Sequence, residues 1–156
     1  MVHDRQLIRL WRCGSGPRQA IGRLETMIKT ILLLLIEDEG LILDFARLAL
    51  EDAGYEVVTA AEGTAALGLL DARIEQIAGL ITDIRLSAPS PDGWEIARHA
   101  RELKPAIPVI YTSGDSAADW TAHGVPKSVM LQKPYAPAQL ITAVSQLLNQ
   151  ADSGLA

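Results

Sequence analysis

Hydrophobic and polar positions alternate along residues 27–150 in a pattern that predicts strands and helices in turn. Short apolar runs of strand length are followed by longer stretches in which apolar residues return every three or four positions. Five such strand–helix pairs predict an α/β fold with a parallel sheet. Right-handed crossovers favour a doubly wound five-stranded sheet in the order 2-1-3-4-5, with helices on both faces.

Turn and cap residues help to place the bounds of these elements. The strands are expected at about 30–36, 55–59, 79–82, 107–112 and 128–132. The second to fourth helices are expected at about 62–73, 94–104 and 115–122, with the first ending at Gly54 and the last running from Pro137 to about Gln150. Glycine suits the left-handed position that ends a helix, and proline suits the first turn.

Two of the expected helices carry an apolar stripe that would face the sheet. The stripe of the first helix consists of Ile42, Phe45, Ala46, Ala49 and Ala53. The stripe of the last helix consists of Leu140, Ile141, Val144, Leu147 and Leu148. Both helices are therefore expected to bury one side.

The two ends of the chain differ from its centre. Residues 1–26 hold five arginines against two acids, a net charge of +3, and include the turn-forming segment Gly14–Pro17. This segment is either a basic arm for an acidic partner or a flexible leader, and we expect the leader. The domain itself is expected at 27–150, followed by a frayed tail at 151–156.

Composition excludes several classes of protein. The chain has 156 residues and a formal charge of −5, and the part after residue 26 carries −8, which makes direct DNA binding unfavourable. Cys13 is the only cysteine, so an intrachain disulfide and a cysteine metal cluster are excluded. The longest apolar run, Ile31–Ile36, is too short for a membrane span, and we expect a cytoplasmic protein.

Residues suited to phosphoryl chemistry stand at the ends of four expected strands. They are Glu37 and Asp38 after the first strand, Asp83 after the third, Thr112 at the end of the fourth, and Lys133 with Pro134 after the fifth. The carboxyl ends of parallel strands meet at one edge of a sheet, where ligands bind. These side chains are therefore expected to converge.

The three carboxylates predict a metal site. Two unit charges about 4 Å apart repel by roughly 4 kcal/mol at an effective dielectric of about 20, and a hard divalent cation relieves that repulsion. We expect Mg²⁺, with Asp38 and Asp83 as direct ligands and Glu37 acting through water. Alternatively, Glu37 and Asp38 only begin the first helix, where acids favour the dipole.

Asp83 is the candidate nucleophile, because a carboxylate can attack phosphorus to form an acyl phosphate. Thr112 would donate its hydroxyl to a phosphoryl oxygen, and the Lys133 ammonium would bind another. A cis peptide bond between Lys133 and Pro134 would aim the lysine into the site. Each residue alone has a plainer explanation: Asp83 could cap a turn, and Thr112 could be a β-branched strand residue.

Together these residues resemble the receiver domain of two-component response regulators, over about residues 28–149. The matching motifs are Glu37-Asp38, Asp83, Thr112, Lys133-Pro134 and Asp92-Gly93, which resembles the dipeptide that opens the third helix of the family. The resemblance implies that Asp83 takes a phosphoryl group from a sensor histidine kinase or a histidine phosphotransfer protein. It also implies that the carbonyl of Arg85 completes the magnesium shell, and that phosphotransfer and dephosphorylation are self-catalysed, without an external substrate.

The chain departs from the family pattern at two places. The spacing from Asp83 to Gly93 is two residues longer than usual, in the segment Ser87–Pro91, which either reshapes access to the site or is a neutral insertion. Met130 stands where the family commonly has an aromatic residue whose rotation reports phosphorylation. A flexible methionine cannot act as that switch, and Tyr111 or Trp120 could replace it or simply pack.

The expected function is that of a stand-alone receiver that signals to a downstream protein target or relays phosphate. Residues 1–26 are too short and glycine-rich for a helix-turn-helix. Two alternatives remain, namely a phosphorylation-independent binding module and an aspartyl-phosphate hydrolase, which would normally need Asp-x-Asp after the first strand. Pairing of two copies through the fourth helix, fifth strand and fifth helix is left open.

Overall fold

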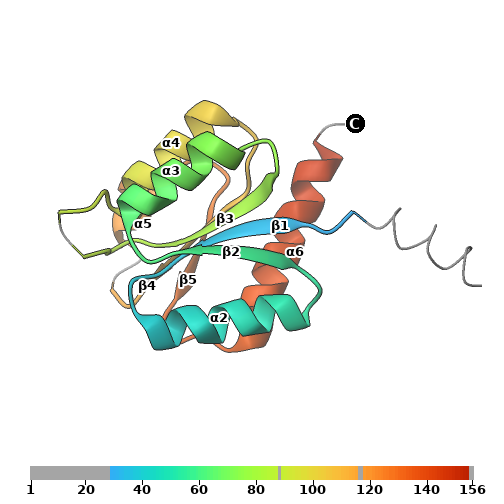
Figure 1. The fold of residues 1–156 in the computed structure, drawn as a ribbon, viewed down its shortest axis with the longest axis horizontal. Coiled ribbons are helices and arrows are strands. Elements are labelled where there is room, and N and C mark those ends of the chain that lie inside the picture. The colour runs from blue at the N-terminus through green and yellow to red at the C-terminus, as the bar shows by residue number, and fades with distance from the viewer. Residues whose placement is uncertain (1–28, 88, 116–117, 155–156) are drawn as a thin grey trace, which may run out of the picture.

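A computed structural model describes residues 29–87, 89–115 and 118–154 (Figure 1). Five parallel strands form one sheet in the order β2-β1-β3-β4-β5. The strands are β1 (Leu32–Ile36), β2 (Glu56–Ala60), β3 (Ile77–Asp83), β4 (Val109–Ser113) and β5 (Val129–Gln132). The helices are α2 (Gly40–Asp52), α3 (Gly63–Arg73), α4 (Gly93–Leu103), α5 (Ala118–His123) and α6 (Pro137–Ser153). The predicted fold and strand order are confirmed, while the expected extension at 1–26 lies outside the described residues.

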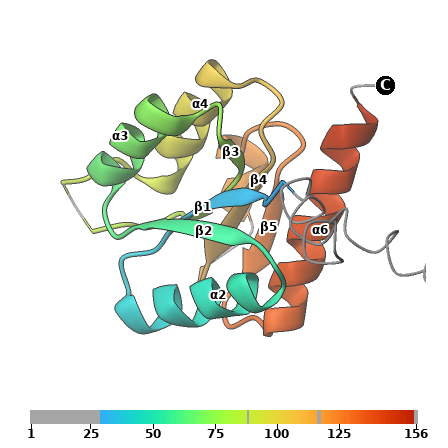
Figure 2. The same cartoon turned by 45° about the vertical axis from the view of Figure 1, so that its right-hand side comes forward.

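Helices cover both faces of the sheet. Helices α3 and α4 lie on one face, and α2 and α6 lie on the other (Figures 1 and 2). Alternate residues of a strand point to opposite faces, so Leu34 joins the core under α3 and α4 while Leu33 joins the core under α2 and α6. This two-sided burial explains why all five residues of β1 are buried and why its sequence reads as one apolar run.

The predicted stripe of α6 is correct, but that of α2 is wrong in part. Helix α2 buries Ala46 and Leu50, whereas Phe45 is 46% exposed and Ala53 lies exposed just beyond the helix. The reason is that α2 has apolar side chains around most of its circumference, so periodicity alone does not select the buried side. The small side chain of Ala46 allows close packing on the sheet, and Phe45 is left facing outward.

Two helix ends show how local chemistry sets the bounds. Gly54 has a φ of 95°, the left-handed conformation predicted for the residue that ends the first helix. Helix α6 runs to Ser153, three residues past the expected Gln150, so part of the expected frayed tail is helical. Ala151 and the two residues after it contain no helix breaker, and the chain leaves the helix only at Gly154.

Among the described residues, the helices are all too short or too polar to span a lipid bilayer.

Candidate functional site

The fold brings the predicted site residues to one edge of the sheet. Asp83, the last residue of β3, is in register with Thr112 of β4, and both are buried. Glu37 and Asp38 directly follow β1, and Lys133 directly follows β5. This edge lies at the left in Figure 1, where β1 ends and α2 begins.

Three carboxylates form a compact acidic cluster at this edge. Glu37, Asp38 and Asp83 each offer a ligand atom, and these atoms all lie within 4.8 Å of one another. Mg²⁺ favours a site with one or two carboxylates plus further oxygen ligands, so the donor set fits this ion. The predicted convergence of Asp38 and Asp83 is therefore present in the fold.

Lys133 joins two of these carboxylates. Its Nζ donates to Glu37 Oε2 at 2.6 Å and to Asp83 Oδ2 at 3.0 Å. The peptide bond between Lys133 and Pro134 is cis, as the sequence suggested. The backbone N–H of Lys133 also donates to the carbonyl of Ser113 at 2.8 Å, which fixes the start of this loop against β4.

Burial and pairing act in opposite directions on these charges. Burial is the main cause that raises the pKa of Glu37. The hydrogen bond from Lys133 lowers this pKa, and the nearby charge of Asp83 raises it further. Burial alone would lower the pKa of Lys133, but its hydrogen bonds to Glu37 and Asp83 outweigh this effect, and the pKa lies above its usual value. The lysine therefore stays protonated at neutral pH.

Asp83 is held rigidly. Its Oδ1 accepts the N–H of Arg85 at 3.3 Å, and its Oδ2 accepts from Lys133. The start of α4 packs against its backbone, because the N–H of Gly93 donates to the Ile84 carbonyl at 2.9 Å. A Cβ on Gly93 would collide with the Asp83 carbonyl oxygen, so only glycine fits at this position.

Asp38 has a different environment, because it is exposed. Its Oδ2 accepts two hydrogen bonds from Ser87, one from the backbone N–H at 3.1 Å and one from Oγ at 2.7 Å. The side-chain hydrogen bond is the main cause that lowers the pKa of Asp38. Ser87 was not predicted as a site residue, and the only signal for it was the longer loop in which it lies.

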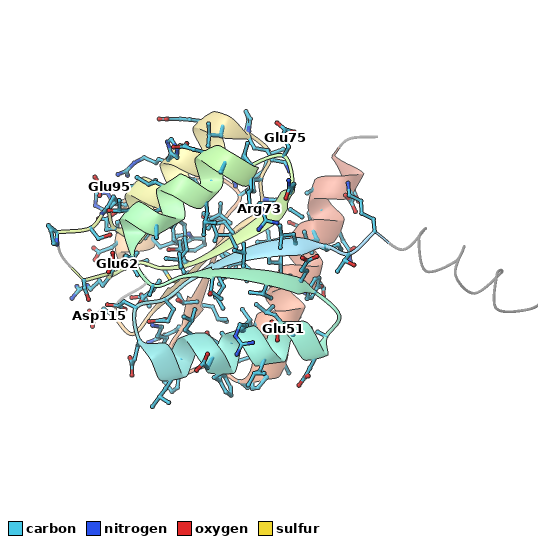
Figure 3. All side chains as sticks on the ribbon, in the orientation of Figure 1. Glu51, Glu62, Arg73, Glu75, Glu95 and Asp115 are labelled. Carbon is cyan, nitrogen blue, oxygen red and sulfur yellow. The ribbon has the colours of Figure 1, made fainter. Side chains whose placement is uncertain are left out.

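Arg85, in the loop between β3 and α4, has an exposed side chain. Its guanidinium pairs with Asp115 Oδ2 at 2.7 Å, so the loops that follow β3 and β4 are joined. Figure 3 labels Asp115 at the end of the sheet where β1 finishes. Sequence reasoning did not find Asp115, and the role of the Arg85 carbonyl as a metal ligand stays a prediction.

Tyr111 and Trp120, the two candidates to replace the aromatic switch residue, are held by packing and hydrogen bonds. Tyr111 is fully buried, its hydroxyl accepts the N–H of Val125 at 3.1 Å, and its ring centroid lies 4.6 Å from that of Trp94. Trp120 donates its ring N–H to Ser128 Oγ at 3.0 Å. Met130 is partly buried against the same core.

Known proteins with similar sequences carry the same kind of domain. The profile of the response regulator receiver domain matches residues 33–145. The response regulator receiver protein CpdR of Brucella abortus is 31% identical over 121 residues, which cover 76% of this chain and 98% of CpdR. The sensor kinase CckA of the same organism is 33% identical over 122 residues, but the chain spans 76% of its own length and only 13% of CckA.

Solved structures agree with this assignment. A response regulator receiver protein from Sinorhizobium medicae is 45% identical, with a TM-score of 0.75 over 79% of this chain and 98% of that protein. The receiver domain of the hybrid histidine kinase CckA is 30% identical, with a TM-score of 0.64 over 75% of this chain and 98% of that domain. The chain belongs to the response regulator receiver domain family of two-component systems.

Proposed function

We propose that Asp83 is the phosphoacceptor of this receiver domain and takes its phosphoryl group from a phosphohistidine on a sensor kinase or a histidine phosphotransfer protein. One observation carries this proposal. Asp83 is a buried carboxylate within 4.8 Å of the ligand atoms of Glu37 and Asp38, and it is also bound by Lys133. A strand-end aspartate that only caps a turn would have no need of these neighbours.

The chain's own residues support an in-line transfer. A carboxylate oxygen of Asp83 forms a bond to phosphorus as the phosphorus–nitrogen bond of the phosphohistidine breaks, and the imidazole nitrogen keeps the electron pair. Lys133 has three N–H donors and uses two of them on Glu37 and Asp83, so one remains for a phosphoryl oxygen. Thr112, in register with Asp83, offers a hydroxyl to another phosphoryl oxygen.

The acidic cluster supports the proposal of a magnesium site. Asp38 and Asp83 would bind the ion directly, Glu37 would act through water, and the Arg85 carbonyl would complete the set. When bound, Mg²⁺ would offset the repulsion between these carboxylates and the incoming phosphoryl oxygens. The rigid hold on Asp83 then keeps its carboxylate in place as the charge builds up.

An exposed apolar face on α2 supports a protein as the phosphodonor. Leu41, Phe45 and Leu48 are 84%, 46% and 52% exposed, and their spacing places them on one side of the helix. Helix α2 begins two residues after Asp38, so a partner seated on this face would lie beside the acceptor. We propose that the donor's histidine-bearing surface contacts this face, and that signalling onward uses a further protein partner.

We also propose that the domain acts on no external substrate beyond its phosphodonor. The nucleophile follows β3, whereas the Asp-x-Asp that aspartyl-phosphate hydrolases need is absent after β1. A generic aryl phosphate should therefore label the protein and turn over only at the slow rate at which the acyl phosphate hydrolyses. Rapid, continuous release of the aryl alcohol would instead establish a hydrolase.

Intact mass spectrometry tests the proposal. Acetyl phosphate with Mg²⁺ should add one phosphoryl group to the wild type, and chelation of the metal should prevent this. The Asp83→Asn variant should stay unlabelled, while Asp92→Asn, which alters a helix-capping carboxylate of the neighbouring loop, should be labelled normally. If the wild type takes no phosphoryl group from acetyl phosphate or from a phosphorylated histidine donor, the domain is a phosphorylation-independent binding module.

A further inference from the structure

The loop between β3 and α4 reaches back to the acidic cluster through Ser87. Both the backbone N–H and the Oγ of Ser87 donate to the same oxygen of Asp38, Oδ2, at 3.1 and 2.7 Å. The two residues are 49 positions apart in the chain, so this is a tertiary contact and not a local turn. These two hydrogen bonds connect the longer segment Ser87–Pro91 to a predicted metal ligand.

The loop is anchored at its other end, so Ser87 is held in position. The N–H of Ser90 donates to the Ser87 carbonyl at 3.3 Å, and Ser90 Oγ accepts the N–H of Thr64 at 3.2 Å. Gly63 lies so close that a Cβ there would collide with the Pro91 carbonyl oxygen and with Ser90 Oγ. The start of α3 therefore supports the loop that presents Ser87 to Asp38.

The two hydrogen bonds fix how the Asp38 carboxylate is oriented. A carboxylate oxygen accepts about two hydrogen bonds through its lone pairs, so Ser87 satisfies Oδ2 and leaves Oδ1 for a cation. An exposed aspartate without such partners would rotate among several positions and would pay an entropic cost on binding a metal. Outer partners that orient a ligand in this way raise metal affinity in proteins.

We propose that Ser87 is a positioning residue for the divalent cation, acting through Asp38. This inference rests on the proposed magnesium site and goes beyond it, because it assigns a role to the longer loop. The alternative is that Ser87 competes with the metal for Asp38. In that case, removing the Ser87 hydroxyl would strengthen metal binding instead of weakening it. The sign of one affinity change therefore decides between the two roles.

The test is a titration of isotopically labelled protein with MgCl₂, followed by the amide NMR signals near Asp83. Ser87→Ala keeps the backbone N–H and loses the hydroxyl, and it should weaken the Mg²⁺ affinity by about tenfold. Ser87→Thr keeps a hydroxyl and should restore the affinity. Ser153→Ala removes an exposed hydroxyl at the last residue of α6, far from the acidic cluster, and serves as the control that should bind Mg²⁺ like the wild type.

The metal-free melting temperature separates positioning from folding. Ser87 is exposed, so Ser87→Ala should melt like the wild type without Mg²⁺ and gain less stability when Mg²⁺ is added. If Ser87→Ala melts early, comparison of Ser87→Thr with the nearly isosteric Ser87→Val isolates the hydroxyl. An unchanged or tighter affinity in variants that lack the hydroxyl overturns the role of Ser87, whereas a wild type that binds no Mg²⁺ overturns the proposed metal site itself.

Discussion

Lys133 determines how three acidic side chains can share the edge of one sheet. Glu37 is buried, and Asp83 has little exposed surface, so both carboxylates have lost most of their hydration. The ammonium group lies within 3.0 Å of an oxygen on each and supplies the compensating charge. Removing one partner of a buried ion pair costs more than the pair contributes, because a charge is left buried and alone.

Lys133→Met should therefore lower the free energy of unfolding at pH 7 by roughly 3 kcal/mol. The loss should shrink as the pH falls toward about 5, because the raised pKa of Glu37 lets the folded variant take up a proton and remove one unpaired charge. Urea unfolding at both pH values measures this. The control is Lys29→Met at an exposed position, and equal losses at both pH values, or none, would contradict the role given to Lys133.

Arg85 is expected to influence how long the acyl phosphate survives. Its ion pair with Asp115 joins the two loops on either side of the acceptor, so removing the arginine should open the site to water. Arg85→Ala is predicted to shorten the lifetime of the phosphorylated protein severalfold, as followed by loss of the phosphoryl mass with time. Asp115→Ala should have the same effect if the ion pair is responsible, and an unchanged lifetime in both variants would refute it.

The regular packing of strands and helices was predictable from the sequence, but the contacts made by loops were not. The burial of β1 follows from its unbroken apolar run, and the stripe of α6 follows from periodicity, because one side of that helix is clearly apolar. The prediction that Phe45 lies on the buried side of α2 was wrong, because this helix carries apolar side chains around most of its circumference. Ser87 and Asp115 could not be found from sequence, because both contacts depend on where an irregular loop lies in space.

The exposed apolar face of α2 should affect the rate of phosphotransfer only when the phosphodonor is a protein. Replacing Leu41 and Phe45 together by serine should slow phosphotransfer from a histidine donor protein, because apolar contact area is lost from the encounter surface. Labelling by acetyl phosphate, which needs no such surface, should proceed as in the wild type. Comparing the two labelling rates on the same protein measures this. A slowing that is equal with both donors would place the effect in the site and not at the surface.

The start of α4 is expected to tolerate no side chain at Gly93. A Cβ there would collide with the Asp83 carbonyl, so Gly93→Ala should cost about 1–3 kcal/mol of stability through overpacking. Gly68→Ala is the matched control, since it lies within α3 with open space around it and should stabilise by about 0.5–1 kcal/mol. Thermal unfolding gives both values, and equal signs for the two variants would contradict this packing.

The sheet topology assembles the site from distant parts of the chain. Glu37 and Lys133 are 96 positions apart, yet they meet because the strands before them end at the same edge. The alternation of strands and helices was enough to predict this edge, and the residue types at the strand ends were enough to predict the chemistry. The sequence could not predict the loop contacts around the acidic cluster, such as those of Ser87 and Asp115, because these loops have no periodic pattern.

Locating the phosphoryl group on the chain tests most directly whether Asp83 is the phosphoacceptor. Borohydride reduces an aspartyl phosphate to homoserine, so phosphorylated protein can be reduced, digested and mapped by mass spectrometry. Homoserine is expected at position 83, and only when both a phosphodonor and Mg²⁺ were present. A reduction product at Glu37 or Asp38, or a phosphorylated protein with residue 83 unchanged, would show that Asp83 is not the phosphoacceptor.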